Sequence, residues 1–266
     1  MRSKIFAILL SLVFFWVSSL SAQVDFRNSD RGRPILIEDA YPIEFLAFEL
    51  QGGIQYERRE GGNGSSFRPE FRFGGYKNLQ AGGEAGYNRL WNEKSRSGIS
   101  DTFVHLLYNF NQEGLEIPAL SIRLDGGIPT GGLGTDNTNA SAALLATKSF
   151  RELRLHSNLS YTLGPTALEG EGVELSRYFY GLGIDYTWPL KFIMVMGDVV
   201  LIKPIDNQKS ELLLELGTRM QIHPKWVLDI GVGTGAFKEE GVDFTFTTGL
   251  TYIFGIRKVS LRRPYP

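Results

Sequence analysis

One stretch near the end of the chain alternates between large apolar and small polar side chains. From Val242 to Phe254, aromatic and aliphatic residues hold most of the even positions, whereas Asp243, glycine and threonine hold most of the odd ones. Because successive side chains on a strand point to opposite faces, this pattern predicts a strand with one apolar, aromatic face and one polar face.

The same alternation recurs along the chain and predicts about twelve strands. Their ranges are 43–57, 66–76, 79–91, 101–111, 117–128, 138–148, 152–163, 176–188, 190–202, 210–222, 225–234 and 242–254. The ninth is apolar on both faces except at Asp198, so its register stays open. An even number of strands, each long enough to cross an apolar band of about 25 Å, is typical of single-chain barrels in bacterial outer membranes.

The connections between these strands give a second indication of a barrel. Links after the even-numbered strands are short, whereas most links after the odd-numbered ones are longer, as at 60–65, 92–100, 129–137 and 164–175. Short turns at one end and long loops at the other are typical of outer-membrane barrels, and they put both termini on the periplasmic side. The fold class predicted is therefore all-β: a transmembrane, antiparallel, up-and-down β-barrel of about 12 strands.

The start of the chain resembles a secretion signal of a Gram-negative bacterium. Arg2 and Lys4 precede an apolar run that ends in small residues, which predicts a signal peptide at 1–22, with a retained membrane anchor as the alternative. Residues 23–42 are polar and contain two prolines, so they are assigned to a periplasmic N-terminal segment, with insertion into the lumen as the alternative. The barrel is placed at 43–254 and a C-terminal tail of undefined role at 255–266.

Composition excludes several classes of function. Removing Arg2 and Lys4 from the 28 basic residues leaves 26 against 29 acidic ones, a formal charge of −3, and no basic tract predicts a nucleic-acid partner. The chain has no cysteine, which excludes disulfides and thiolate chemistry. The three histidines are scattered, so no metal site and no cofactor are predicted.

Two motifs resemble enzyme signatures. The run 227–235 is similar to the glycine-rich first motif of class I methyltransferases, but no helical pattern follows it and only 31 residues remain. It is interpreted as a strand whose glycines face a crowded lumen. His156-Ser157-Asn158 resembles the His-x-Ser-Asn element of outer-membrane phospholipases and lipid A deacylases. Here the histidine and serine are adjacent and would face opposite ways, so His156 is interpreted as filling the lumen, and the chain is not expected to be an enzyme.

An ordered set of phrases resembles the putative meta-pathway-of-phenol-degradation family of outer-membrane transporter-like proteins. The matches are 32–40, Glu49 with Tyr56, 69–74, 98–101, 118–120, 129–131, 155–161, 180–182 and 228–233. The resemblance implies a barrel linked to the uptake of aromatic compounds. Three features depart from the family: Leu106-Leu107 stands where a lysine is usual, Asp198 replaces a glutamate, and the chain continues past Phe254.

The function predicted is the passage or binding of a small solute, with an aromatic compound implied by the resemblance. Inward-facing charges near the middle of the strands are expected to constrict the pore and select the solute: Glu49, Arg72, Glu84, Arg123, Asp125, Glu215 and Arg219. A closed, salt-bridged interior is the alternative for these residues. A non-conducting structural or surface-interaction barrel is the alternative function, followed by a membrane-embedded lipid hydrolase. Expected partners are outer-membrane lipid, the solute and the barrel-assembly machinery, whereas solute identity, an open or plugged pore and the oligomeric state stay open.

Overall fold

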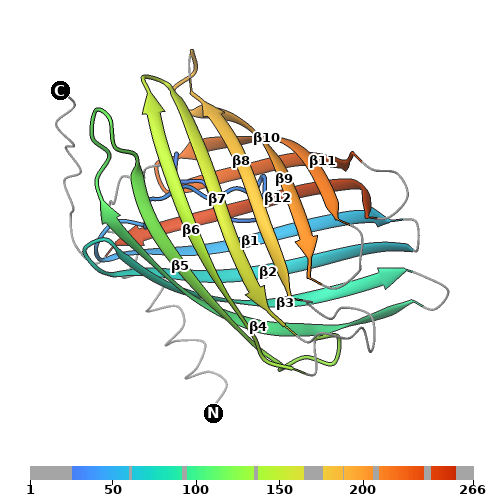
Figure 1. Ribbon diagram of the computed structural model, residues 1–266. Helices are drawn as coiled ribbons and strands as arrows, with labels where there is room; N and C mark the ends of the chain where they lie inside the picture. Colours follow the sequence, from blue (N-terminus) through green and yellow to red (C-terminus); the bar gives the residue numbers. More distant parts are fainter. Residues whose placement is uncertain are drawn as a thin grey trace, which may run out of the picture.

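The chain forms a closed barrel of twelve antiparallel strands (Figure 1). The structure is a computed structural model, and it describes residues 26–59, 62–91, 95–134, 137–164, 176–187, 189–205, 210–236 and 241–255. The strands are β1 (Ala47–Arg59), β2 (Gly62–Tyr76), β3 (Leu79–Trp91), β4 (Arg96–Asn111), β5 (Ala119–Ile128), β6 (Asn139–Phe150), β7 (Leu153–Leu163), β8 (Arg177–Tyr186), β9 (Ile193–Pro204), β10 (Glu211–His223), β11 (Trp226–Gly235) and β12 (Val242–Gly255). Within the described residues, no helix is long and apolar enough to cross a membrane.

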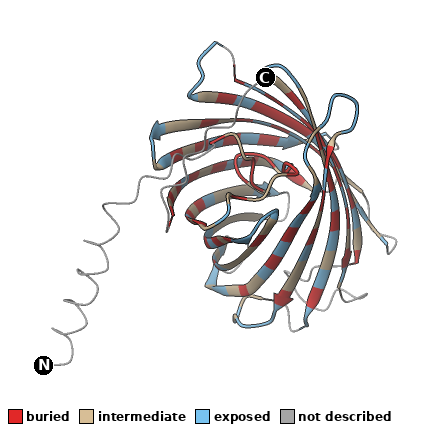
Figure 2. Ribbon diagram, turned by 90° about the vertical axis from the view of Figure 1, so that its left-hand side faces the viewer, coloured by how far each residue is buried: buried red, intermediate tan, exposed pale blue. Residues whose placement is uncertain are grey.

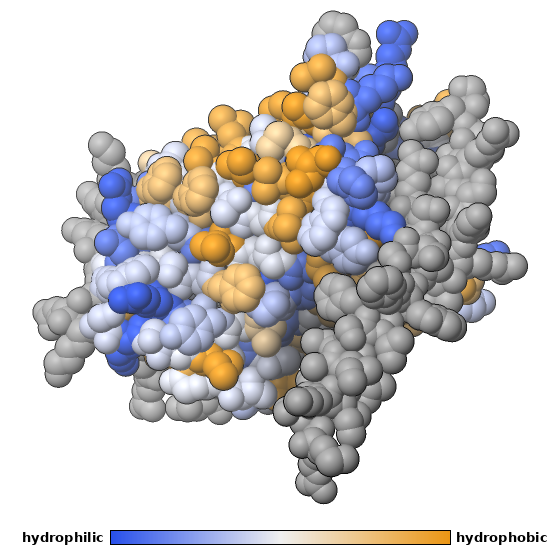
Figure 3. All heavy atoms as spheres, turned by 180° about the vertical axis from the view of Figure 1, so that it is seen from behind, coloured by the Kyte–Doolittle hydropathy of each residue, from blue (hydrophilic) through white to orange (hydrophobic). Residues whose placement is uncertain are grey.

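Each strand pairs with its neighbours in the sequence, and β12 pairs with β1 to close the cylinder. The predicted fold class is therefore confirmed. The exposed side chains of the strands are mostly aliphatic and aromatic, whereas the buried ones that face the inside are mostly polar. Figure 3 shows one outer face, on which apolar residues gather between more hydrophilic ends, so the exterior suits the hydrocarbon of an outer membrane. The alternation fails at one end of β12. The register with β1 shifts between Arg58 and Arg59, so Val242 lies opposite Arg59 and only 4% of it is exposed.

The connections are less regular than the sequence suggests. The first and third links were expected at 60–65 and 92–100, but β2 already begins at Gly62 and β4 at Arg96. Both strands gain residues because polar and glycine-rich positions still continue the ladders. Conversely, the link between β4 and β5, residues 112–118, is longer than the brief turn expected. The signal peptide, the loop 165–175 and the tail from 256 onward lie outside the described residues.

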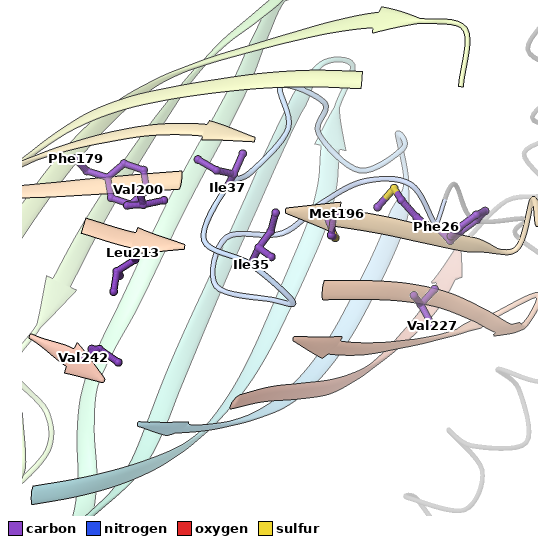
Figure 4. Packing of buried hydrophobic residues seen from close by; sticks show 10 residues of the cluster. Phe26, Ile35, Ile37, Phe179, Met196, Val200, Leu213, Val227 and Val242 are labelled. Atoms are coloured by element: carbon purple, nitrogen blue, oxygen red, sulfur yellow. The ribbon is translucent and has the colours of Figure 1, made fainter. Parts of the chain in front are cut away.

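The inner segment, which we define as residues 26–46, lies inside the barrel (Figure 2). Ile35, Ile37 and Ala40 are at most 2% exposed, although they belong to no strand. This placement corresponds to the alternative of insertion into the lumen rather than to a segment lying in the periplasm. It also explains the apolar inner face of β9, since Ile35 and Ile37 pack against a cluster that includes Met194, Met196 and Val200 (Figure 4).

Aromatic rings cross the closure between β12, β1 and β2 on the outer wall. The ring of Phe48 stacks on Phe73 and on Phe254, with centroid separations of 4.6 and 5.2 Å. Tyr252 continues the stack to Trp226 at 4.6 Å. Phe254 is therefore the last aromatic of the barrel wall, as the sequence pattern predicts, and it packs directly on the first strand.

We expect Phe48→Ala to weaken the closure. The change removes three ring contacts, to Phe71, Phe73 and Phe254, worth about 0.5–1.5 kcal/mol each, beyond the buried area. The temperature at which the folded, heat-modifiable form unfolds on gel electrophoresis should fall. Phe150→Ala is the matched control, because Phe150 is 54% exposed and lies outside this stack. An equal fall in both variants would contradict the role of the stack.

Candidate functional site: the occluded lumen

All seven predicted lumen residues line the inside of the barrel. Glu49, Arg72, Arg123, Glu215 and Arg219 are at most 7% exposed, the side chain of Asp125 is 12% exposed, and Glu84 is half-buried. Glu84 lies opposite Glu70 in the ladder between β2 and β3, so the two side chains share the inner face. Five of the seven contact the inner segment directly: Arg72, Arg219, Arg123, Asp125 and Glu215. Glu49 is linked to the segment through Gln51, which donates both to Glu49 and to Asp30.

Asp30, near the start of the described part of the inner segment, is neutralised by two wall arginines. The carboxylate of Asp30 contacts Arg72 on β2 and lies 2.6 Å from Arg219 on β10. Next to it, Arg33 pairs with Glu70 at 3.4 Å and donates a hydrogen bond to Gln51. Charges buried to this extent are costly unless they are paired, so the wall and the segment depend on each other for neutralisation.

Two further acids of the inner segment meet arginines on β5 and β7. Glu38 accepts two hydrogen bonds from one nitrogen of Arg123, at 2.8 and 2.9 Å. Asp39 lies 3.2 Å from Arg154, which also holds Asp185 at 2.7 Å. Three of the four acids of the segment thus each lie at a wall arginine.

Sequence reasoning did not nominate Glu70, Arg154 or Asp185, nor any acid of the inner segment. Glu70, Arg154 and Asp185 alternate with apolar residues along their strands, so the sequence already places them on the polar face of the wall. This alternation is the signal from which they could have been identified. Asp30, Glu38 and Asp39 carried a weaker signal: a cluster of charges that precedes the first amphipathic strand.

His156 belongs to this polar network. Its Nε2 lies 2.8 Å from Asp185, and its Nδ1 lies 3.0 Å from the hydroxyl of Thr147. That hydroxyl also accepts the backbone N–H of Ala40 at 2.9 Å, so the inner segment covers the histidine. Ser157 is exposed on the outer wall, which confirms that the two residues face opposite ways. Among the residues that the structure describes, no cluster of histidines and acids could hold a metal ion.

Glycines of the wall make room for the inner segment. A side chain at Gly217 would come within 2.7 Å of Pro34, and one at Gly231 would collide with the Pro34 carbonyl. Gly181 and Gly183 on β8 leave a similar space for Ile37. Gly231 belongs to the run that resembles a methyltransferase motif. It lies on β11 and faces an occupied lumen, as interpreted from the sequence.

A hydrogen bond at the rim holds the segment where it leaves the lumen. Tyr41 donates a hydrogen bond at 3.1 Å to Glu113, which lies in the link between β4 and β5. Partial burial acts to raise the pKa of Glu113, but the backbone N–H and hydroxyl of Ser149, together with Lys148, outweigh it and lower the pKa below its usual value. Because this folded-state pKa is lowered, the contribution of Glu113 to stability is fully present above the ordinary glutamate pKa of about 4.3. It is lost as pH falls through the lowered value.

Known proteins resemble this chain in fold rather than in sequence. No family model and no curated protein matches it. Among solved structures, the COG4313 outer membrane channel from Pseudomonas putida F1 is similar over 81% of this chain and 98% of its own, with a TM-score of 0.63 and 12% identity. The NanC porin (77% and 98%, TM-score 0.54, 10% identity) and the KdgM porin in complex with disordered oligogalacturonate (77% and 98%, TM-score 0.51, 14% identity) share the fold as well. The chain therefore has the fold of outer-membrane channels and porins.

We expect Glu38→Ala to loosen the inner segment, because it leaves Arg123 buried beside fewer acids. Breaking one partner of a buried pair costs about 3–5 kcal/mol. Trypsin should then cleave after Arg27 or Arg31 at least tenfold faster, as measured by mass spectrometry of the folded protein. Glu57→Ala is the matched control, since Glu57 pairs with Arg59 at a partly exposed site away from the segment. Unchanged protection in Glu38→Ala would show that this pair does not hold the segment.

Proposed function

We propose that this barrel passes a small solute across the outer membrane and that the inner segment opens and closes the path. The observation that carries the proposal is that the backbone ladders of the wall do not include the segment. The ring of twelve ladders is complete without residues 26–46, and the only bridge within the segment joins Asp30 to Arg33. The segment can therefore leave the lumen without breaking a backbone hydrogen bond between strands.

The predicted lumen charges are proposed to line the path once the segment has moved. Arg72, Arg123 and Arg219 would exchange the acids of the segment for water or for polar groups of the solute. Glu49, Glu84, Asp125 and Glu215 provide the opposite sign, so the constriction would select by hydrogen bonding as well as by charge. The KdgM porin, which has the same fold, was solved with an oligogalacturonate, and this supports passage of a small solute in general terms.

The resemblance to the phenol-degradation family implies an aromatic solute. Apolar side chains of the wall support this as a candidate class, because Phe179, Val200 and Leu213 gather on the inner face of β8 to β10. Arg31 lies above the ring of Phe179, with 5.9 Å between its guanidinium carbon and the ring centroid. Growth of a deletion strain on aromatic carbon sources tests this class: normal growth on all of them argues against it.

A second candidate function is a non-conducting barrel. The buried ion pairs around Asp30 favour it, because a segment held by several such pairs could stay in place permanently. Conductance measurements separate a permanent filling from a movable one.

A disulfide between the segment and the wall gives a direct test. A Cβ atom at position 183 would lie 3.1 Å from the Cβ of Ile37, a few tenths of an ångström below the range of about 3.5–4.5 Å in disulfides. The chain has no other cysteine, so Ile37→Cys/Gly183→Cys can form a single bridge. In planar bilayers, the oxidised protein should show little conductance, and reduction should raise it several-fold.

Gly183→Cys alone is the matched control, because it carries the same wall change without a partner. Its conductance should not respond to the reductant. Equal conductance of the oxidised and reduced double variant, together with no solute flux in liposomes for wild-type protein, would overturn the proposal in favour of a non-conducting barrel.

A further inference from the structure

The wall of the lumen recognises the backbone of the inner segment. The N–H groups of Leu36 and Ile37 both donate to Asp198, at 2.9 and 3.0 Å, and the N–H of Leu36 also donates to Glu215 at 2.8 Å. Asp198 and Glu215 lie directly opposite each other on β9 and β10. Two carboxylates therefore accept hydrogen bonds from two successive amides, which point the same way because the chain bends at residues 34–36.

Further wall side chains continue this recognition toward the rim. The side-chain amide of Asn158 both accepts the N–H of Glu38 and donates to its carbonyl, at 2.9 and 2.8 Å. Thr147 accepts the N–H of Ala40, whose carbonyl accepts a hydrogen bond from Asn109 at 2.9 Å. At the two ends, Thr247 donates to the carbonyl of Pro34 and Gln80 accepts the N–H of Ile43.

The wall also accommodates individual side chains of the segment at separate positions. Pro34 occupies the space left by Gly217 and Gly231, and Ile37 occupies the space left by Gly181 and Gly183. Glu38 reaches Arg123. These positions of the wall together match a segment with a proline, a branched apolar residue three positions later and an acidic residue directly after that.

Buried backbone groups need partners in any folded protein, so hydrogen bonding alone does not define a binding groove. Here, however, the partners are side chains on eight different strands, and they reach N–H and C=O groups of one continuous stretch. Peptide-binding proteins likewise combine recognition of the main chain with separate sites for particular side chains.

We infer that the lumen is a binding groove for an oligopeptide with the bent conformation of residues 34–43 and that the inner segment occupies it as a tethered ligand. The inference rests on the proposed function, because it names the solute class of the same lumen. The ligand class is an oligopeptide with proline, a branched apolar residue three positions on, and an acidic residue directly after that. This class differs from the aromatic compounds that the family resemblance implies.

The test uses the full chain with a weakened segment and an intact wall. Ile37→Asp/Glu38→Ala puts a charge beside Asp198 and removes the partner of Arg123. A fluorescent peptide of residues 33–43 is then added to the protein in detergent, and binding is followed by anisotropy. The peptide should bind the double variant at least tenfold more tightly than wild-type protein, whose groove the tethered segment occupies. It should also reduce the conductance of the variant in bilayers.

Matched changes in peptide and wall make the result specific. A scrambled peptide, or one with arginine at the position of Ile37, should bind at least tenfold more weakly. Adding Gly183→Leu to the double variant should abolish binding, whereas adding Gly126→Ala should not, because a Cβ at Gly126 meets only ordinary contact at 3.7 Å. Circular dichroism and heat-modifiable mobility verify folding, and Glu38→Ala alone replaces the double variant if that does not fold.

The outcomes separate this inference from the proposed function. A variant that conducts but binds no peptide, or binds the scrambled peptide equally well, overturns the peptide groove and leaves the channel. A variant that binds the peptide but never conducts supports the groove and overturns the channel. A folded variant that does neither overturns both.

Discussion

Closure of β1 on β12 is the constraint on which the rest of the structure depends. In hydrocarbon, every backbone N–H and C=O group must find a partner within the protein, and only a sheet without edges achieves this with strands. The pairing runs from Ala47 opposite Gly255 to Arg59 opposite Val242, with one register shift near the end. Phe48, stacked between Phe73 and Phe254, adds side-chain packing at the same closure.

A closed wall of twelve strands encloses more space than its own side chains fill. The inner segment takes up part of this space, and the polar character of the lumen follows from that contact. The wall arginines meet acids of the segment, and the carboxylates of Asp198 and Glu215 meet its backbone amides. The apolar inner face of β9 meets Ile35 and Ile37. Charge, hydrogen bonding and apolar packing therefore match the same short stretch of chain.

The strands of the wall could be predicted from the sequence because apolar and polar residues alternate every two positions within each strand. Phe244 and Thr245 already show which way each faces, and the same is true of Arg123 and Leu124. The segment inside the lumen could not be predicted in this way. Its contacts, such as that between Asp30 and Arg219, join residues far apart in the chain, and no repeating pattern connects them. One signal was present nevertheless. A strand that is apolar on both faces, as β9 is, needs an apolar partner inside the barrel. From the sequence pattern, only the register of this strand was open.

The position of Asp198 and Glu215 indicates why the segment would return after leaving. The two carboxylates project from directly opposed positions on neighbouring strands, and the N–H of Leu36 donates to both. Withdrawal of the segment would leave two acids side by side with no amide between them, and two neighbouring carboxylates repel each other when both are charged. The wall ladders, in contrast, lose nothing when the segment moves. The backbone pairing that closes the barrel is thus separate from the side-chain contacts that hold the segment, which is the condition for a local opening that leaves the fold intact.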